Sequence, residues 1–231
     1  MPRASSLLPL VVCVAPSCAL VTRAVLDTPG FATDVALGGT LAYVADGVSG
    51  LRVVDVADPS SPDELGSWNT PGSAEDVEVV GGIAWVADRD AGLRAIDVSD
   101  PATPFEIGFF DTPYFANDVE LSGDLAFVAD GAAGLRVIDV SAPTNPVEIG
   151  ALATAASDVA TADGLVYVAA NDRTVRIVDL GPEYVPAPGG WLPVWPPWVR
   201  RAGWRRADPA SRSPRGRPSG RNRVQTAAKK P

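Results

Sequence analysis

The sequence predicts an all-β fold built from tandem repeats of about 42 residues. A seven-residue motif, Gly-Leu-Arg-Val-Val-Asp-Val from Gly50, returns with small changes at Gly92 and Gly134, and a weaker copy starts at Thr174. No segment shows a sustained 3.6-residue apolar period with helix caps, so no helix is expected. The 22 Gly and 22 Pro residues supply the many turns that short strands need. A regular period of this length is typical of a repeat architecture.

Each repeat resolves into four short strands separated by turns. In the first copy, the expected strands cover residues 33–37, 41–45, 51–56 and 64–68. Gly38-Gly39 is a hairpin signal between the first two strands. The third strand is apolar almost throughout instead of alternating, which indicates that both of its faces are covered.

Four antiparallel strands in about 40–45 residues are the size of one β-propeller blade. We therefore predict a β-propeller of about four four-stranded antiparallel blades, or four and a half if the N-terminus holds part of an earlier copy. A solenoid and a β-sandwich are alternatives, and the sandwich ranks lower because it does not require a regular repeat. Ring closure is left open, with an incomplete ring as one expectation, because terminal repeats expose apolar faces unless they are capped or closed.

The third copy resembles a known repeat. Residues 135–141 read Leu-Arg-Val-Ile-Asp-Val-Ser and are followed by Pro143 and Pro146. This motif resembles the LVIVD repeat of bacterial and archaeal exported or surface proteins, and the resemblance extends over about residues 31–183. It implies a β-propeller with an extracellular role. The family usually carries more repeats than this chain, which raises the expectation of missing blades.

The N-terminal segment, residues 1–22, is open to two interpretations. Arg3, the apolar run 7–14 and the small residues around Cys18 are typical of a secretory signal peptide, which predicts export to the periplasm, the cell surface or the medium. Alternatively, residues 11–17 align with residues 53–60, and the segment is then a degenerate partial repeat. Such a repeat could supply strands to a blade begun at the C-terminus. The propeller repeats occupy residues 23–184 under either interpretation.

The C-terminal segment, residues 185–231, differs from the repeats in composition and charge. It is rich in Pro, Trp and Arg, which predicts a disordered tail. The tail has a net charge of +10, whereas residues 1–184 have a net charge of −19. The acidic body disfavours nucleic acid as a partner, while the basic tail could touch anionic surfaces.

An arginine and an aspartate recur in the third strand of every copy. One pair per repeat fits an architectural role better than a single active site. We expect the pairs to join neighbouring blades as ion pairs, or the aspartates to satisfy turn amides instead. The residues concerned are Arg52, Asp55, Arg94, Asp97, Arg136, Asp139, Arg176 and Asp179.

Further acids recur where the first strand begins and where the second strand ends, which places both sets at the same end of each blade. Hard cations such as Ca²⁺ prefer carboxylate ligands. The acids that begin the first strand are therefore weak candidates for binding calcium, with turn capping as the alternative. These acids are Asp34, Asp76, Asp118 and Asp158. No other cofactor is expected. The acids that end the second strand are assigned to a binding face: Asp46, Asp88 and Asp130.

The loops before the first strands carry Phe31, Tyr114 and Phe115. Aromatic side chains on exposed loops are candidates for ligand contact, although Phe31 and Phe115 could instead tuck between blades. The chain has no His, nucleophile elbow, Walker loop or zinc-protease motif, so we predict no enzymatic activity.

The function expected from these features is that of an exported, non-catalytic binding or scaffold module. Its partner would be a protein, a peptide or a surface glycan, bound through one face of the propeller. One alternative is a calcium-dependent propeller enzyme that uses the recurring acids. Another is a truncated fragment of a longer LVIVD array without independent function. Missing blades or a second copy of the chain are then the partners to expect.

Overall fold

The computed structural model describes residues 21–180. The chain divides into two units, Met1–Pro193 and Val194–Pro231, and the description concerns the first. The predicted tail, residues 185–231, lies outside the described residues. So does the predicted signal peptide or partial repeat, apart from its last two residues.

Fifteen strands and no helix make up the secondary structure of residues 21–180. The first blade consists of β1 (Asp34–Gly38), β2 (Leu41–Ala45), β3 (Leu51–Asp55) and β4 (Asp63–Trp68). The second consists of β5 (Asp76–Val80), β6 (Ile83–Ala87), β7 (Leu93–Asp97) and β8 (Phe105–Phe110). The third consists of β9 (Asp118–Ser122), β10 (Leu125–Ala129), β11 (Leu135–Asp139) and β12 (Val147–Leu152). The fourth consists of β13 (Ala156–Ala162), β14 (Leu165–Ala170) and β15 (Thr174–Asp179).

Every blade is an antiparallel sheet whose strands follow chain order. Blades 1 to 3 have four strands, as the sequence predicts. Blade 4 differs from the prediction, because its described part has three strands and ends at β15. The prediction of an all-β propeller with no helix is confirmed. Within residues 21–180 no helix exists that is long and apolar enough to cross a membrane.

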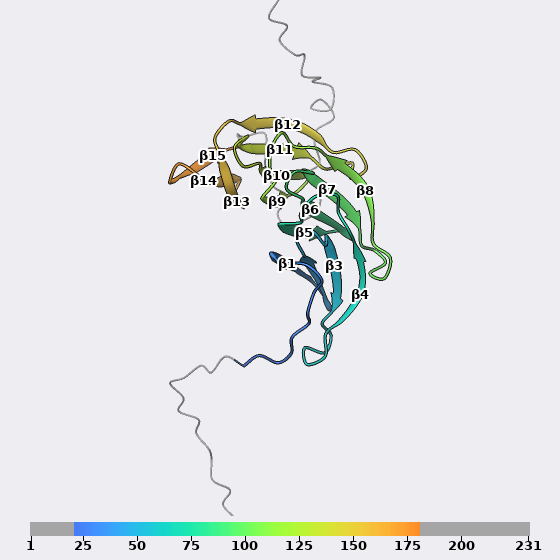
Figure 1. The fold of residues 1–231 in the computed structure, drawn as a ribbon. Coiled ribbons are helices and arrows are strands. Elements are labelled where there is room, and N and C mark those ends of the chain that lie inside the picture. The colour runs from blue at the N-terminus through green and yellow to red at the C-terminus, as the bar shows by residue number, and fades with distance from the viewer. Residues whose placement is uncertain (1–20, 181–231) are drawn as a thin grey trace, which may run out of the picture. The chain divides into compact units, whose positions relative to one another are not determined.

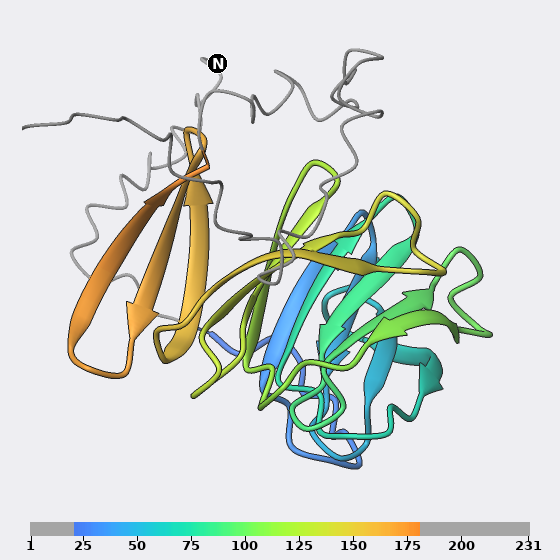
Figure 2. The same cartoon turned by 90° about the horizontal axis from the view of Figure 1, so that it is seen from above.

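The blades are arranged in chain order with their first strands innermost. β1 packs beside β5, β5 beside β9 and β9 beside β13, and the fourth strands β4, β8 and β12 lie outermost (Figure 1). Figure 2 shows the three-stranded sheet of blade 4 at one end of this series. In the described part of the chain, no comparable packing joins blade 4 to blade 1.

Apolar side chains fill the space between each pair of consecutive blades. Leu51 and Val53 of blade 1, for example, pack in one cluster with Ile96 and Val98 of blade 2. Similar clusters join blades 2 and 3 and blades 3 and 4. We call the surface of a blade that meets the following blade its front face, and the surface that meets the preceding blade its back face. Since third-strand side chains alternate between two covered faces, the strand needs apolar residues on both.

Candidate functional site

The aspartates that begin the first strands bind the following blade. Each carboxylate accepts a hydrogen bond from a backbone N–H in the first strand of the next blade. The donors are Val77 to Asp34 at 3.2 Å, Val119 to Asp76 at 2.9 Å and Val159 to Asp118 at 2.7 Å. These acids therefore join consecutive blades, a role that the sequence assigned to the third-strand residues instead.

Two glutamates that sequence reasoning missed strengthen the same contacts. Glu78 accepts a hydrogen bond from the N–H of Leu121. Glu120 accepts one from the N–H of Thr161 at 3.3 Å and one from its hydroxyl at 2.9 Å. Each lies two residues after a first-strand aspartate, and therefore on the same side of its strand. That spacing was the available signal, although it is present in only two of the four copies.

Burial raises the pKa of these carboxyl groups well above the ordinary range. The pKa of Asp76 rises to about 8, that of Glu78 to about 7 and that of Asp118 to about 6. Desolvation is the largest cause in each case, and neighbouring carboxylates add to it. Among residues 21–180 no group of three acids is arranged to hold a metal ion. Calcium binding by Asp34, Asp76, Asp118 and Asp158 remains an untested prediction.

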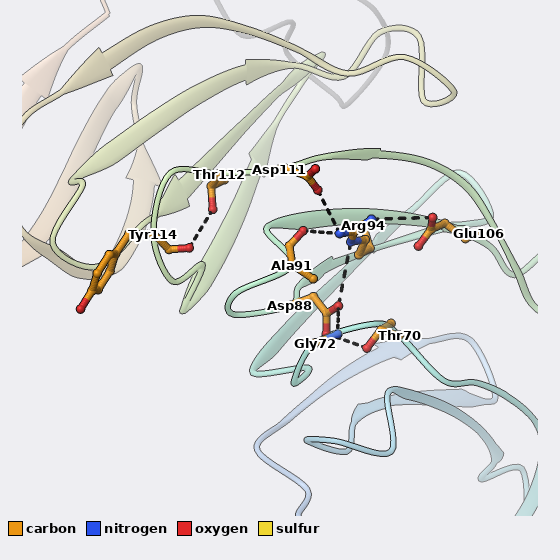
Figure 3. Close-up of polar contacts among 9 residues, drawn as sticks. All are labelled: Thr70, Gly72, Asp88, Ala91, Arg94, Glu106, Asp111, Thr112 and Tyr114. Atoms are coloured by element: carbon orange, nitrogen blue, oxygen red, sulfur yellow. Dashed lines mark hydrogen bonds and ion pairs between the residues drawn. The ribbon is translucent and has the colours of Figure 1, made fainter.

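The aspartates that end the second strands are buried inside the blades. The Asp88 side chain is fully buried, and it accepts hydrogen bonds from the hydroxyl of Thr70 at 2.6 Å and the N–H of Gly72 at 2.8 Å (Figure 3). Asp46 and Asp130 are also fully buried and accept bonds from the equivalent linkers. Their assignment to an exposed binding face is corrected, because none of the three carboxylates reaches the surface.

The third-strand arginines complete these networks inside their own repeats. Arg94 donates to the carbonyl oxygen of Ala91 at 2.5 Å and to Asp111 at 3.0 Å, and it pairs with Asp88 at 3.9 Å and Glu106 at 3.8 Å (Figure 3). Arg52 pairs with Asp46 and Glu64, and Arg136 with Asp130 and Glu148. All of these partners belong to the arginine's own blade or to the linker that leaves it. The prediction of ion pairs between blades is therefore wrong for these three arginines.

The third-strand aspartates serve the turns that follow them. Asp55 accepts a hydrogen bond from the N–H of Ala57 at 2.8 Å. Asp97 accepts bonds from the N–H of Ser99 at 2.9 Å and from its hydroxyl, and Asp139 accepts one from the N–H of Ser141 at 2.9 Å. Satisfying turn amides is the alternative that the sequence left open for these residues.

The predicted aromatic residues are exposed on the loops. Phe31 is 79% exposed, so the alternative in which it tucks between blades is wrong. Tyr114 and Phe115 lie against each other with ring centroids 4.4 Å apart, and the guanidinium of Arg89 lies 5.2 Å from the Phe115 ring. Sequence reasoning missed Arg89, because blades 1 and 3 have glycine at that position of the turn.

Comparison with known proteins identifies the repeat and the fold. The family model of the LVIVD repeat matches three consecutive segments, residues 29–70, 71–112 and 115–154. No curated protein matches the chain. The computationally designed Ika4 protein is similar in structure, with a TM-score of 0.58 at 11% identity over 71% of this chain and 99% of Ika4. The designed Ika8 protein is similar with a TM-score of 0.53 at 12% identity over 65% of this chain and 46% of Ika8.

These likenesses to designed proteins concern the fold alone, whereas the family match concerns the sequence itself. The matched segments follow one another with at most two residues between them, and each spans one four-stranded blade. Because they cover more than half of the residues, the chain belongs to the LVIVD repeat family.

Proposed function

We propose that the protein is a non-catalytic binding module, exported from the cell, whose loop face holds a protein or peptide partner with basic residues. The loop face is formed by the Arg89 turn and the loops that carry Phe31, Tyr114 and Phe115. One observation supports the proposal above all others. Apart from Asp158, the recurring acids of blades 1 to 3 that could serve chemistry are engaged by amides, hydroxyls or arginines, which leaves the aromatic cluster as the most individual exposed surface.

The chemistry of this face suits a protein or peptide. Tyr114 is 45% exposed and Phe115 is 36% exposed, so both rings offer apolar area that contact with a partner would bury. Aromatic side chains and arginines dominate the binding energy of protein interfaces. The net charge of −19 on residues 1–184 favours a partner with basic residues. Export is supported by the apolar run 7–14 and by the family resemblance.

A peptide-array experiment tests this proposal. The full chain would be applied to matched arrays of basic, neutral and acidic peptides, with a glycan array in parallel. We expect binding to basic peptides, and we expect Tyr114→Ala and Phe115→Ala each to weaken it by about tenfold, equivalent to ~1.4 kcal/mol. The matched control is Phe105→Ala, since Phe105 is a comparably exposed aromatic residue on the outermost strand of blade 2.

Three outcomes would count against the proposal. Absence of peptide binding would reject the partner class. An equal loss in Phe105→Ala would reject the loop face as the site. Binding to glycans that both loop variants abolish would keep the site and reassign the partner to a carbohydrate.

A further inference from the structure

The back face of blade 1 has the composition of an inter-blade surface, yet no blade formed by residues 21–180 covers it. Val35 is 56% exposed, whereas its equivalents Val77, Val119 and Val159 in the next blades are 4%, 4% and 5% exposed. Ala32 is exposed as well, while its equivalents Ala74, Ala116 and Ala156 are fully buried. An apolar surface of this kind marks an interaction site.

A groove of about 430 Å³ runs over this back face. Its apolar lining includes Val35, Ala42, Val44, Val54 and Val56. The residues 42 positions later in blade 2 are Val77, Ala84, Val86, Ile96 and Val98, and all five pack in the cluster between blades 1 and 2. The groove therefore has the lining of a blade-docking surface, and no blade among the described residues occupies it.

The front face of blade 4 is the complementary open surface. Val175 is 69% exposed and Ile177 is 63% exposed, whereas Leu51 and Val53 hold the same two positions in blade 1 and are fully buried. Asp158 is also exposed. It stands at the position where Asp34, Asp76 and Asp118 each accept an amide from the next blade. In the described part of the chain it accepts none.

The N-terminal residues 21–26 match the strand that blade 4 lacks. They read Val-Thr-Arg-Ala-Val-Leu and lie 126 residues, or three repeats, before β12, which reads Val-Glu-Ile-Gly-Ala-Leu. In every four-stranded blade a strand of this kind pairs with the outer edge of the third strand. The outer edge of β15 has no such partner within the described residues.

The contacts of the following linker place residues 21–26 on the course of a fourth strand. The hydroxyl of Thr28 and the N–H of Gly30 bind Asp46 at 2.6 and 2.8 Å. Thr70 and Gly72, which follow β4, bind Asp88 with the same geometry. Leu26 lines the groove on blade 1, as Trp68 packs at the interface between blades 1 and 2. Residues 21–26 thus approach blade 1 as β4 approaches blade 2.

One position departs from this pattern. Ala24 stands where blades 1 to 3 have Gly66, Gly108 and Gly150. A methyl group at Gly66 would lie 2.6 Å from the carbonyl oxygen of Pro101 in the next blade. By the repeat, Pro59 stands where blade 2 has Pro101, so its turn must leave room for the methyl group of Ala24.

We propose that a second copy of this chain docks head to tail on these surfaces. The front face of blade 4 in one copy covers the back face of blade 1 in the other, and residues 21–26 of the other copy pair with β15 as the missing outer strand. Asp158 then accepts a hydrogen bond from the N–H of Val35. The interface repeats the one between blades 1 and 2, where the glutamate position is also an alanine, Ala36, matching Ala160.

The occupant is a second copy because both halves of the interface belong to this chain and do not meet in the part of it that the structure describes. The front face, the back face and the strand reproduce an interface that the chain already forms three times. Such a head-to-tail contact either closes a ring of copies or continues into a filament. The inference is independent of the proposed binding function, since the loop face is not part of it.

The oligomeric state of the full chain tests this inference. We expect sedimentation velocity at micromolar concentration to show a dimer or a larger assembly. Val35→Glu blocks the back face and Ile177→Glu blocks the front face, and each variant alone should sediment as a monomer. An equimolar mixture of the two variants should form dimers and nothing larger, because only one intact contact can form between them.

The control is Val48→Glu, since Val48 is 79% exposed on a turn that belongs to neither face. This variant should assemble like the unaltered chain. All three replaced side chains are exposed in the single copy, and circular dichroism with a thermal melt verifies that each variant folds. A monomeric unaltered chain would overturn the inference, and so would variants that keep the assembly or a mixture that fails to restore dimers.

Discussion

Blades 2 and 4 carry the same third-strand motif but differ in what surrounds it. Leu93 in blade 2 is fully buried, whereas Val175 at the same position of blade 4 is 69% exposed. The difference does not come from the strand, which pairs in the same register with its neighbour in both blades. It comes from the next blade, which covers blade 2, whereas no blade within residues 21–180 covers the front face of blade 4. Burial in a repeat array is a property of neighbouring units as much as of the strand itself.

The polar contacts of the third-strand arginine differ between blades 2 and 4 in the same way as the burial of the apolar side chains. The side chain of Arg94 is 8% exposed and has four oxygen partners, one of them the buried Asp88. In blade 4 the side chain of Arg176 is 41% exposed and pairs with Asp172, and Ala170 stands where blade 2 has Asp88. Few buried contacts and exposed polar bonds are the features of regions that open locally at low cost. We therefore expect blade 4 to be the least stable part of the described array.

The largest effect should come from removing the buried carboxylate of blade 2. Asp88→Ala leaves the Thr70 hydroxyl and the Gly72 amide without their acceptor and deprives Arg94 of one anion. We expect a loss of about 3–5 kcal/mol in the free energy of unfolding, as for other broken buried pairs. Urea denaturation followed by tryptophan fluorescence measures this loss.

Asp172→Ala is the matched control for that experiment. It removes the partner of Arg176 from an exposed site in blade 4, so its effect should be far smaller. Equal losses in the two variants would contradict the expectation that blade 2, which is covered on both faces, depends more on its polar contacts than blade 4 does. Asp88→Asn should recover only part of the loss, because Thr70 and Gly72 donate to different oxygens of Asp88 and the single amide oxygen can accept from one of them.

The turn before the third strand offers the next comparison. Gly92 has a φ of +80°, and a methyl group there would meet the carbonyl oxygen of Phe110 and lie 2.6 Å from the amide nitrogen of Thr112. Gly92→Ala should therefore cost about 2–4 kcal/mol from backbone strain and overpacking together. In blade 4 the equivalent residue is Thr174, and the positive φ lies at Arg173 instead. Thr174→Ala should change the free energy of unfolding by no more than about 0.5 kcal/mol in the same urea assay. A comparable loss in Gly92→Ala and Thr174→Ala would show instead that the two turns are equivalent.

The strands were predictable from sequence because their signals are local. Alternation, apolar runs and turn residues such as Gly38-Gly39 act over a few residues, and the strands of blades 1 to 3 lie within about two residues of the expected positions. The number of strands in blade 4 was not predictable in this way. The segment that matches its missing strand lies at the other end of the chain, and pairing between distant segments leaves no local trace.

The partners of the charged residues were harder to predict, for a geometric reason. Arg94 and Asp97 lie three positions apart in one strand, so their side chains emerge on opposite sides. That geometry suggested contact across a blade interface. In the structure Arg94 reaches Asp88, at the end of the neighbouring strand, while Asp97 turns back to Ser99. Recurrence identified which residues are structural, but only the sheet register decides which of them meet.

The smallest effect should be a dependence of stability on pH that the buried interior acids confer. Burial raises the pKa of Asp76 to about 8, so the folded chain binds more protons than the unfolded chain between about pH 4 and pH 8. Stability should therefore fall as the pH rises through this range, by about 1–2 kcal/mol between pH 5 and pH 8. One pKa unit is worth ~1.4 kcal/mol, and partial solvation reduces the full amount.

Asp76→Asn should reduce this slope, because a neutral amide still accepts from Val119 without titrating. Glu78 and Asp118, whose pKa values are also raised, should keep the remaining slope. Asp158→Asn changes the exposed equivalent in blade 4. It removes a neighbouring charge that helps to raise the pKa of Asp118, so it should change the profile less than Asp76→Asn does. The carboxyl groups with a lowered pKa, Asp58 and Asp97 among them, destabilise the fold only when they are protonated at lower pH, so they do not mask the effect above pH 5.

If the second copy docks as proposed, the carboxylate of Asp158 becomes buried and accepts an amide, and the profile of the assembled chain should then depend on Asp158 as well. The Asp158→Asn profile measured above and below the concentration of assembly therefore connects the pH dependence to the interface.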